Sequence, residues 1–309
     1  MTASALDSPI VLTPKAEARV WGGRRLADDL GRTLPDGAIG ESWELHGDLP
    51  VAAGPLAGRT LDSLVAEFGL DLLGSRGEGE SRFPLLTKWL DCRDWLSVQV
   101  HPDDPLSQEL TGQDWQRGKS EAWFVAEVDE GARLIHGLNA GVTAADLEAA
   151  EGDAMLDLLG YVQPARGELL FTAAGTVHAL GPGFLIYEVQ QSSDLTYRLY
   201  DWGRDRPIHP AQSLRCVNEA GPLPFEQDAR GLRCRYFEIA SRQGSGTLQV
   251  DADSFVIVAA VEGEWALSGA FGEHKLAYGD TVLLPAGLGE IRVAGTGRLL
   301  EIKLGDARA

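Results

Sequence analysis

The chain has 309 residues, 44% of them hydrophobic, which is enough for one large β domain or two smaller domains with buried cores. Its 27 Lys and Arg residues stand against 46 Asp and Glu residues, and the formal net charge of −19 argues against nucleic acid or a membrane as the main partner. A small anionic substrate would need a locally basic pocket in such an acidic protein.

The amino-terminal segment has no charged start followed by a long apolar core, so we expect no signal peptide. No apolar run reaches the length of a membrane span. The three cysteines, Cys92, Cys216 and Cys234, are widely spaced and form no CxxC pattern. We therefore expect them to be small buried residues in a reduced, cytoplasmic protein.

Strand-like segments separated by glycine, proline and aspartate dominate the chain and predict a mainly β fold. In the first two thirds they lie at 42–47, 84–91, 96–101, 120–128, 132–138, 168–173, 184–191 and 196–202. Helices are predicted as insertions: one over 60–69 with Thr60 as its N-cap, one that starts at Thr143, and one within 209–218.

The pattern breaks around 218–231, and after it strands resume without helices. We therefore predict two domains, 1–217 and 218–309. The segments 167–183 and 278–295 share the order glycine, acid, apolar strand, small residue, glycine, then a polar residue. That polar residue is His178 in the first segment and Glu290 in the second, which predicts two copies of one β unit, only the first with good metal ligands.

The segment "WLSVQVHPDD" (95–104) alternates like a strand, and the alternation places Gln99 and His101 on one face. A carboxylate, Glu121, follows about twenty residues later, and His178 lies on a later strand. Two imidazoles, a carboxylate and an amide oxygen form a mixed nitrogen and oxygen site, which suits zinc and also accepts manganese, iron or cobalt.

The remaining histidines lack this spacing and are expected to be ordinary polar residues; they are His46, His136, His209 and His274. Asp103 and Asp104 could orient His101, but a turn in which their side chains bond backbone amides explains them better.

The spacing of Gln99, His101, Glu121 and His178 resembles the H-x-H, E and G-x-x-H elements of the cupin superfamily, with glutamine in place of the first histidine. "LSVQVHPDD" and "YEVQQSSDLTYRLYDWGR" resemble the type I mannose-6-phosphate isomerases, in particular the short bacterial form. Four shorter matches occur in the same order: "VWGG", "GESWELHG", "LLTKWLD" and "GKSEAWFV". The resemblance is strong over 10–204 and weak in the last third.

This resemblance implies a cupin fold, that is, a double-stranded β-helix or jelly roll, with helical insertions and a second, degenerate cupin-like β domain. Residues 1–217 would be the metal-binding catalytic domain. The implied activity is a metal-dependent interconversion of mannose 6-phosphate and fructose 6-phosphate through a cis-enediolate, with one zinc ion per chain and a small phosphosugar as the partner. The implied metal ligands are Gln99, His101, Glu121 and His178.

The resemblance also implies three catalytic residues: Arg198, Lys119 and Glu188. We expect Arg198 to stabilise the developing oxyanion, because its guanidinium is permanently charged and forked. The base is either Lys119, with a pKa lowered by zinc, or Glu188, with a pKa raised by burial. Lys88 is the candidate for binding the substrate phosphate, although a solvated strand lysine explains it equally well.

Two other kinds of function stay open at this point. One is a non-catalytic sugar-binding cupin, and the other is a cupin enzyme that acts on another phosphosugar or uses iron and oxygen. The glutamine ligand and the arginine of "TYRLYDWGR" favour sugar isomerisation over oxygenase chemistry.

Overall fold

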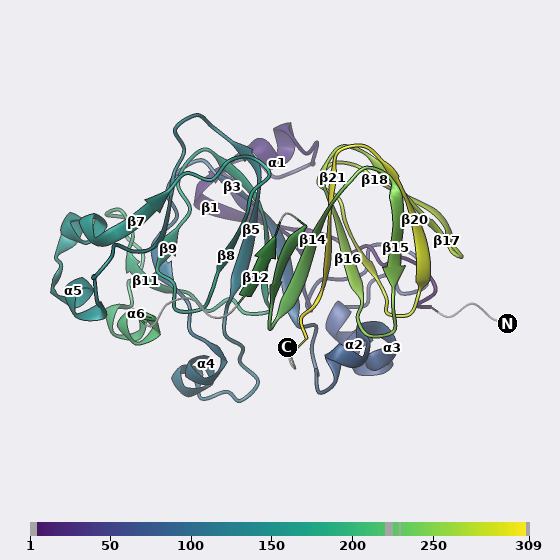
Figure 1. Ribbon diagram of the computed structural model, residues 1–309, viewed down its shortest axis with the longest axis horizontal. Coiled ribbons are helices and arrows are strands. Elements are labelled where there is room, and N and C mark those ends of the chain that lie inside the picture. The colour runs from purple at the N-terminus through teal and green to yellow at the C-terminus, as the bar shows by residue number, and fades with distance from the viewer. Residues whose placement is uncertain (1–4, 220–224, 229, 307–309) are drawn as a thin grey trace. The chain divides into compact units, whose positions relative to one another are not determined.

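A computed structural model describes residues 5–219, 225–228 and 230–306, so part of the expected boundary at 218–231 lies outside the described residues (Figure 1). The chain packs as two compact units, each discontinuous in sequence. The site unit comprises 16–42 and 88–223, and the terminal unit comprises 1–15, 43–87 and 224–309, as far as these are described. The continuous division into 1–217 and 218–309 stays a prediction.

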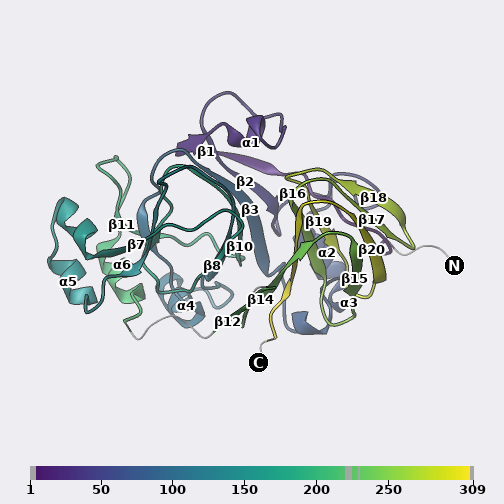
Figure 2. The same ribbon diagram turned by 45° about the horizontal axis from the view of Figure 1, so that its top comes forward.

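Two antiparallel sheets build the site. The first has the order β1 (Lys15–Gly23), β2 (Ile39–Leu45), β3 (Leu85–Cys92), β10 (Phe184–Gln191), β5 (Glu121–Val128) and β8 (Leu169–Thr172). The second has the order β11 (Tyr197–Tyr200), β4 (Val98–Val100), β9 (His178–Ala179), β6 (Leu134–Leu138) and β7 (Leu159–Val162). This pairing of strands distant in sequence is the mainly β architecture expected for a cupin (Figures 1 and 2).

The central strands of the first sheet are largely apolar, and their residues are buried on both faces of the sheet. Every residue of β3 and of β10 is buried, and the aliphatic and aromatic residues Leu90, Trp123, Val125, Phe184 and Ile186 share one core. A strand buried on both faces favours a near-continuous hydrophobic run over alternation. The polar residues within such a run therefore need a specific partner.

The terminal unit holds two more antiparallel sheets. One has the order β12 (Phe225–Asp228), β13 (Gly231–Cys234), β14 (Phe237–Gln243), β21 (Arg298–Leu304), β16 (Val256–Glu262) and β19 (Thr281–Leu284). The other has the order β15 (Gly246–Val250), β20 (Gly289–Gly295), β17 (Trp265–Gly269) and β18 (Gly272–Leu276). The core between them is apolar, and Glu290 points to solvent, so this second cupin-like unit is degenerate, as expected.

The helices are short. They are α1 (Arg25–Asp28), α2 (Leu61–Phe68), α3 (Leu70–Leu73), η1 (Ser75–Gly77), α4 (Asp104–Thr111), α5 (Ala144–Ala149), η2 (Gly152–Leu158) and α6 (Pro210–Cys216). As predicted, Thr60 caps α2 and a helix, α5, begins at Thr143; the structure adds that Thr143 and Asp146 form a capping box there. The helical segment after Thr143 is nevertheless two pieces, because Ala150 and Glu151 have an extended backbone and separate α5 from η2.

Helix α4 was not predicted, because the turn expected at Asp103 and Asp104 is its first turn. Asp103 is the N-cap and accepts a hydrogen bond from the Leu106 amide at 3.0 Å. Among the described residues, no helix is long and apolar enough to cross a membrane. The three cysteines are free; Cys92 and Cys216 are buried and Cys234 is half-buried.

Truncating the core of the terminal unit should destabilise the protein. Leu267 is fully buried on β17 and faces His274 of β18 and Val293 of β20 in register. We expect Leu267→Ala to lower the free energy of unfolding by about 2–5 kcal/mol, because the lost methyl groups leave a cavity. Urea denaturation followed by circular dichroism measures this. Lys275→Ala, at an exposed position of β18, is the control, and equal losses in both variants would contradict the packing.

Candidate metal centre and cavity

One row of side chains crosses the second sheet. Arg198 of β11 lies directly opposite Gln99 of β4, which lies opposite His178 of β9. His136 of β6 continues the row beside His178. Residues directly opposite each other in antiparallel strands project from the same face of the sheet. The register alone therefore places Arg198, Gln99 and His178 side by side.

The first sheet contributes the acidic residues in the same way. Glu121 of β5 lies opposite Gln190 of β10, and Trp123 lies opposite Glu188. Because residues two apart on a strand share a face, Glu121 and Glu188 point to the same side of the sheet. Both carboxylates are buried.

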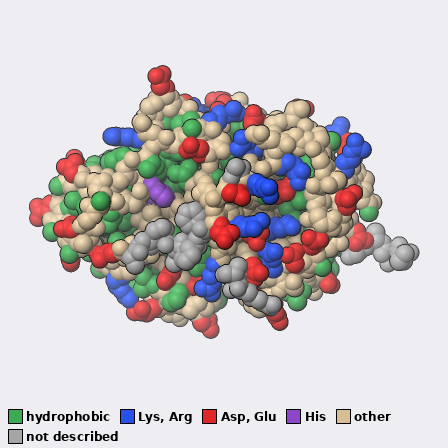
Figure 3. All heavy atoms as spheres, viewed as in Figure 1, with side chains coloured by type: hydrophobic (Ala, Val, Ile, Leu, Met, Phe, Trp, Pro, Cys, Tyr) green, Lys and Arg blue, Asp and Glu red, His purple; other side chains and the backbone are tan. Residues whose placement is uncertain are grey.

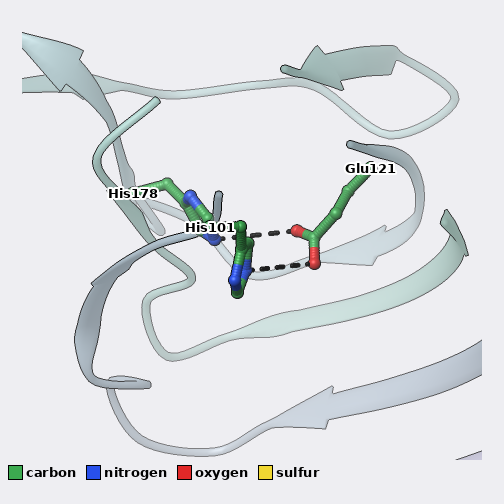
Figure 4. A group of neighbouring side chains, drawn as sticks. All are labelled: His101, Glu121 and His178. Atoms are coloured by element: carbon green, nitrogen blue, oxygen red, sulfur yellow. Dashed lines mark ion pairs between the residues drawn. The ribbon is translucent and has the colours of Figure 1, made fainter. Parts of the chain in front are cut away.

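His101, Glu121 and His178 converge in the interior (Figure 4). The Nε2 atom of His101 lies 3.3 Å from Oε1 of Glu121, and Nε2 of His178 lies 3.6 Å from Oε2. Each of the three side chains is 1% exposed, and their possible ligand atoms lie within 4.8 Å of one another. The structure thus brings together three of the four predicted ligands as one buried group.

The contacts of the Nδ1 atoms show which tautomer each of the two imidazoles adopts. Nδ1 of His101 lies 2.7 Å from the carbonyl oxygen of Leu195, and Nδ1 of His178 lies 2.8 Å from that of Thr176. A carbonyl can only accept, so both Nδ1 atoms carry the proton and both Nε2 atoms present a lone pair. Lone pairs and carboxylate oxygens that face one another in a buried group are stabilised by a cation. This donor set therefore fits a divalent metal ion.

The electrostatics keep the group in its metal-binding form. Burial lowers the pKa of His178 to about 3, and burial together with Lys119 lowers the pKa of His101. Burial alone would raise the pKa of Glu121, but Lys119 and the two histidines hold it well below its ordinary value. Both imidazoles are therefore neutral and the carboxylate is charged at neutral pH.

Gln99, the fourth predicted ligand, lies at the edge of the group. Its Nε2 atom is 3.2 Å from Nε2 of His178, and the Ser97 hydroxyl donates to its Oε1 at 3.3 Å. A half-turn of the amide exchanges the two atoms and presents Oε1 to the group. The structure therefore places Gln99 where an amide oxygen could complete the ligand set.

Lys119 reaches the same group. Its Nζ atom lies 2.8 Å from Oε1 of Glu121 and 3.3 Å from Nε2 of His101. Its side chain is 4% exposed, so this ammonium partly neutralises the buried carboxylate.

A cavity of about 420 Å³ opens beside the metal-binding group. Its wall contains the other residues nominated from the sequence: Lys88, Gln99, Lys119, Glu121, Glu188 and Arg198. On the face shown in Figure 3, Lys and Arg side chains alternate with Asp and Glu side chains over the surface. The charged residues of the cavity wall are likewise of both signs: the basic ones are Arg19, Lys88, Lys119, Arg198 and Arg206, and the acidic ones are Glu41, Glu121, Glu188 and Asp194.

Glu188 and Lys88 form a buried ion pair in the cavity wall. Lys88 Nζ lies 2.8 Å from Oε2 of Glu188, and the Trp123 indole donates to Oε1 at 2.8 Å. Burial raises the pKa of Glu188 to about 6, helped by the nearby charge of Glu121 and opposed by Lys88. Burial would lower the pKa of Lys88, but Glu188 and Glu41 outweigh it and raise this pKa.

Arg198 differs from the other two arginines of the cavity. Arg19 bonds both oxygens of Glu41, at 3.0 and 3.2 Å, and Arg206 bonds both oxygens of Asp201, at 2.7 and 2.5 Å. The buried Nε of Arg198 has no hydrogen-bond partner among the described residues. Burial and Arg206 lower the pKa of Arg198, yet a guanidinium stays charged at neutral pH. Arg198 is thus the least neutralised of the three.

The cavity residues that were not nominated from the sequence include Arg19, Glu41, Arg206 and His209. A signal for them existed. Arg19 directly precedes "VWGG", Glu41 lies within "GESWELHG", and the other two follow "TYRLYDW" within a few residues. Proximity to a motif could have nominated them, whereas His209 was expected to be an ordinary polar residue.

Asp104 ties three segments of the site together. Its Oδ1 atom accepts from the Gly118 amide and from the Gln191 side chain, both at 2.8 Å. The Lys119 amide also donates to the Pro102 carbonyl at 3.0 Å. Asp104 therefore does bond a backbone amide, as predicted for a turn, and it also joins the end of β4 to the ends of β5 and β10.

Comparison with known proteins identifies close relatives. Residues 10–123 match a family model described as phosphomannose isomerase type I, catalytic domain, and residues 231–304 match one described as mannose-6-phosphate isomerase, cupin domain. A curated mannose-6-phosphate isomerase of Streptococcus mutans is 33% identical over 300 residues, 91% of this chain and 93% of that protein. Mannose-6-phosphate isomerase ManA of Bacillus subtilis is 33% identical over 309 residues, 93% of this chain and 96% of that one.

Solved structures agree. The crystal structure of the mannose 6-phosphate isomerase from Bacillus subtilis superposes with a TM-score of 0.83 at 30% identity, covering 96% of this chain and 99% of that one. A phosphomannose isomerase from Salmonella typhimurium shares the fold, with a TM-score of 0.76 at 16% identity and coverage of 96% and 99%.

Removing either imidazole should abolish metal binding. We expect His101→Ala and His178→Ala each to weaken the affinity for divalent ions at least 100-fold, because each removes one of the two nitrogen ligands. Equilibrium dialysis against Zn²⁺, Mn²⁺ or Co²⁺ with elemental analysis measures this. His274→Ala, in the terminal unit, is the matched control, and wild-type metal content in both site variants would refute the assignment.

Proposed function

The chain belongs to the type I mannose-6-phosphate isomerases, and we propose that it interconverts mannose 6-phosphate and fructose 6-phosphate with one divalent ion per chain. We propose zinc, held by Gln99, His101, Glu121 and His178, because two neutral imidazoles with oxygen donors suit it. The single observation that carries this proposal is the buried convergence of two imidazole lone pairs and a carboxylate beside a cavity lined by charged side chains. The free cysteines support a cytoplasmic location.

The reaction moves a proton between C1 and C2 of the sugar through a cis-enediolate. It needs polarisation of the sugar oxygens, a base that takes the proton and returns it, and a group that binds the phosphate. The bound ion would supply Lewis-acid polarisation of a sugar oxygen. The remaining requirements fall to side chains of the cavity wall.

We propose Glu188 as the base. Its carboxylate is buried in the wall, and Lys88 and Trp123 hold its two oxygens. A pKa of about 6 leaves it largely deprotonated at neutral pH while it can still carry a proton during turnover. Lys119 was the other candidate; its contacts with Glu121 and His101 support a different role, as a hydrogen-bond donor to a sugar oxygen beside the metal-binding group.

Arg198 is proposed to stabilise the developing enediolate oxygen. Its partly uncompensated guanidinium lines the cavity directly beside Gln99. A charged donor fixed in place before the reaction stabilises the transition state more than one that must reorganise. Lys88 was nominated for the phosphate. Its 2.8 Å pair with Glu188 supports a role in setting the charge of the base, and the phosphate role stays a prediction.

Replacing Arg198 should impair turnover without loss of metal. We expect Arg198→Ala to lower kcat/KM for mannose 6-phosphate by about 10²–10³-fold, because a charge-stabilising donor is lost. A coupled isomerase assay with elemental analysis of the same sample measures both quantities. Arg233→Ala, at an exposed position of β13, is the control. Metal content with no isomerase activity in the unmodified protein would favour a sugar-binding module instead.

The pH profile should report Glu188. A base acts when deprotonated, so kcat/KM should rise with pH through about 6, and Glu188→Gln should lower the rate by about 10²–10⁴-fold and remove this rise. Lys88→Met removes the cation that stabilises the carboxylate, so the rise should move to higher pH.

These variants separate the two roles of Lys88. A raised KM with an unmoved pH profile in Lys88→Met would assign Lys88 to the phosphate and contradict its pairing role. An unchanged pH profile in Glu188→Gln would exclude Glu188 as the base and return the assignment to Lys119.

A further inference from the structure

The strand that carries Arg198 has an unusual neighbour. β11 is the edge strand of its sheet, so half of its backbone groups point away from β4. At Arg198 these groups are bonded by one residue: the His209 amide donates to the Arg198 carbonyl at 2.7 Å, and the Arg198 amide donates to Nδ1 of His209 at 3.2 Å. His209 thus takes the place of a paired strand at this position.

This arrangement fixes how Arg198 faces Gln99. Because both backbone groups of Arg198 point to His209, Arg198 and Gln99 form a non-hydrogen-bonded pair of the antiparallel ladder. Side chains approach each other more closely in such pairs than in hydrogen-bonded ones. The register shifts between Arg198 and Tyr200, so regular pairing with β4 ends directly after Arg198. The contact with His209 therefore holds the strand at the point where the ladder becomes irregular.

The chemistry of His209 fits this role. An amide N–H can only donate, so Nδ1 is the acceptor and the ring is the neutral tautomer with its proton on Nε2. His209 is the N-cap residue of α6, yet its side chain makes no capping bond. Ser, Thr, Asp or Asn would normally occupy such a position, so this side chain serves Arg198 in place of the helix. Burial and the charge of Arg198 lower the pKa of His209, which keeps the ring neutral.

Ion pairs and hydrogen bonds fix the segment between Arg198 and His209. Asp201 is 4% exposed and binds both nitrogens of the Arg206 fork. Arg204 donates to the Trp95 carbonyl at 2.7 Å and pairs with Asp94 at 2.7 Å. These contacts place His209 before substrate arrives, which is what a positioning residue requires.

We propose that His209 is a positioning residue for Arg198, which it holds in register with Gln99 and the metal-binding group by bonding both backbone groups of Arg198. This inference rests on the proposed role of Arg198 in the isomerase reaction. His209 also lines the cavity, and in this proposal it acts through the backbone of Arg198 rather than by contact with the sugar.

Three variants separate the two ring nitrogens. His209→Ala should lower kcat and kcat/KM equally, by about 10- to 100-fold, because a group that acts in the transition state is misplaced. His209→Asn should retain activity within about threefold of wild type, since its Oδ1 takes the place of Nδ1. His209→Gln, whose amide takes the place of Nε2, should resemble His209→Ala. Full activity in the glutamine variant with loss in the asparagine variant would overturn the proposal, because it would assign the role to Nε2.

A double-mutant cycle tests whether His209 acts through Arg198. In an Arg198→Ala background, His209→Ala should cost less than about twofold, because the group it positions is absent. The same loss in both backgrounds would overturn the inference. Wild-type turnover in Arg198→Ala would instead contradict the proposed role of Arg198, so the two failures are distinguishable.

Folding and metal content complete the test. All His209 variants should keep the metal content of the wild type, measured by elemental analysis, with His274→Ala as the matched control. If His209→Ala unfolds, the comparison of the asparagine and glutamine variants still decides between the ring nitrogens.

Discussion

The buried charge of Glu121, set between two imidazole lone pairs, is the constraint on which the site depends. A carboxylate 1% exposed costs several kcal/mol unless it is compensated. Lys119 supplies part of that compensation by bringing a cation to the carboxylate, while the carbonyls of Leu195 and Thr176 fix the tautomer of each imidazole and turn its lone pair toward the group. The two sheets must therefore hold strands from distant parts of the sequence in one exact register.

Much of this site could be predicted because its signals are local. Gln99 and His101 are two residues apart on one strand, and "TYRLYDW" identifies Arg198 through a family resemblance. Contacts formed only by the fold could not be predicted. His209 lies close to a motif, but nothing in the sequence shows that its ring accepts a hydrogen bond from the Arg198 amide eleven residues earlier. Likewise, the pairing of Ile10 with Leu283 groups the first residues with the last strands, so the compact units are discontinuous.

The two cupin-like units show two ways of filling a β interior. In the terminal unit, residues such as Leu267 and Ile291 fill the space with hydrocarbon, which packs densely and needs no partner for any polar atom. In the site unit, polar side chains occupy the interior, and each needs a specific partner. Glu290, which takes the place of His178 in the second segment of the predicted repeat, points to solvent and away from the apolar core.

An excursion of the chain, residues 105–117, contains most of α4 and the exposed Trp115. Two hydrogen bonds join its ends: the Gly118 amide donates to the Asp104 side chain, and the Lys119 amide donates to the Pro102 carbonyl. Because these bonds join the strand end at His101 directly to the start of β5, the excursion does not set the distance between His101 and Glu121. The excursion is nevertheless anchored, because Ser107 is fully buried, Leu106 and Leu110 pack against the core of the site unit, and Gln116 donates to the Ser193 hydroxyl at 3.1 Å. A peptide or label inserted at its exposed tip, 112–115, would therefore leave the geometry of the site intact, whereas one inserted in α4 would disturb the core.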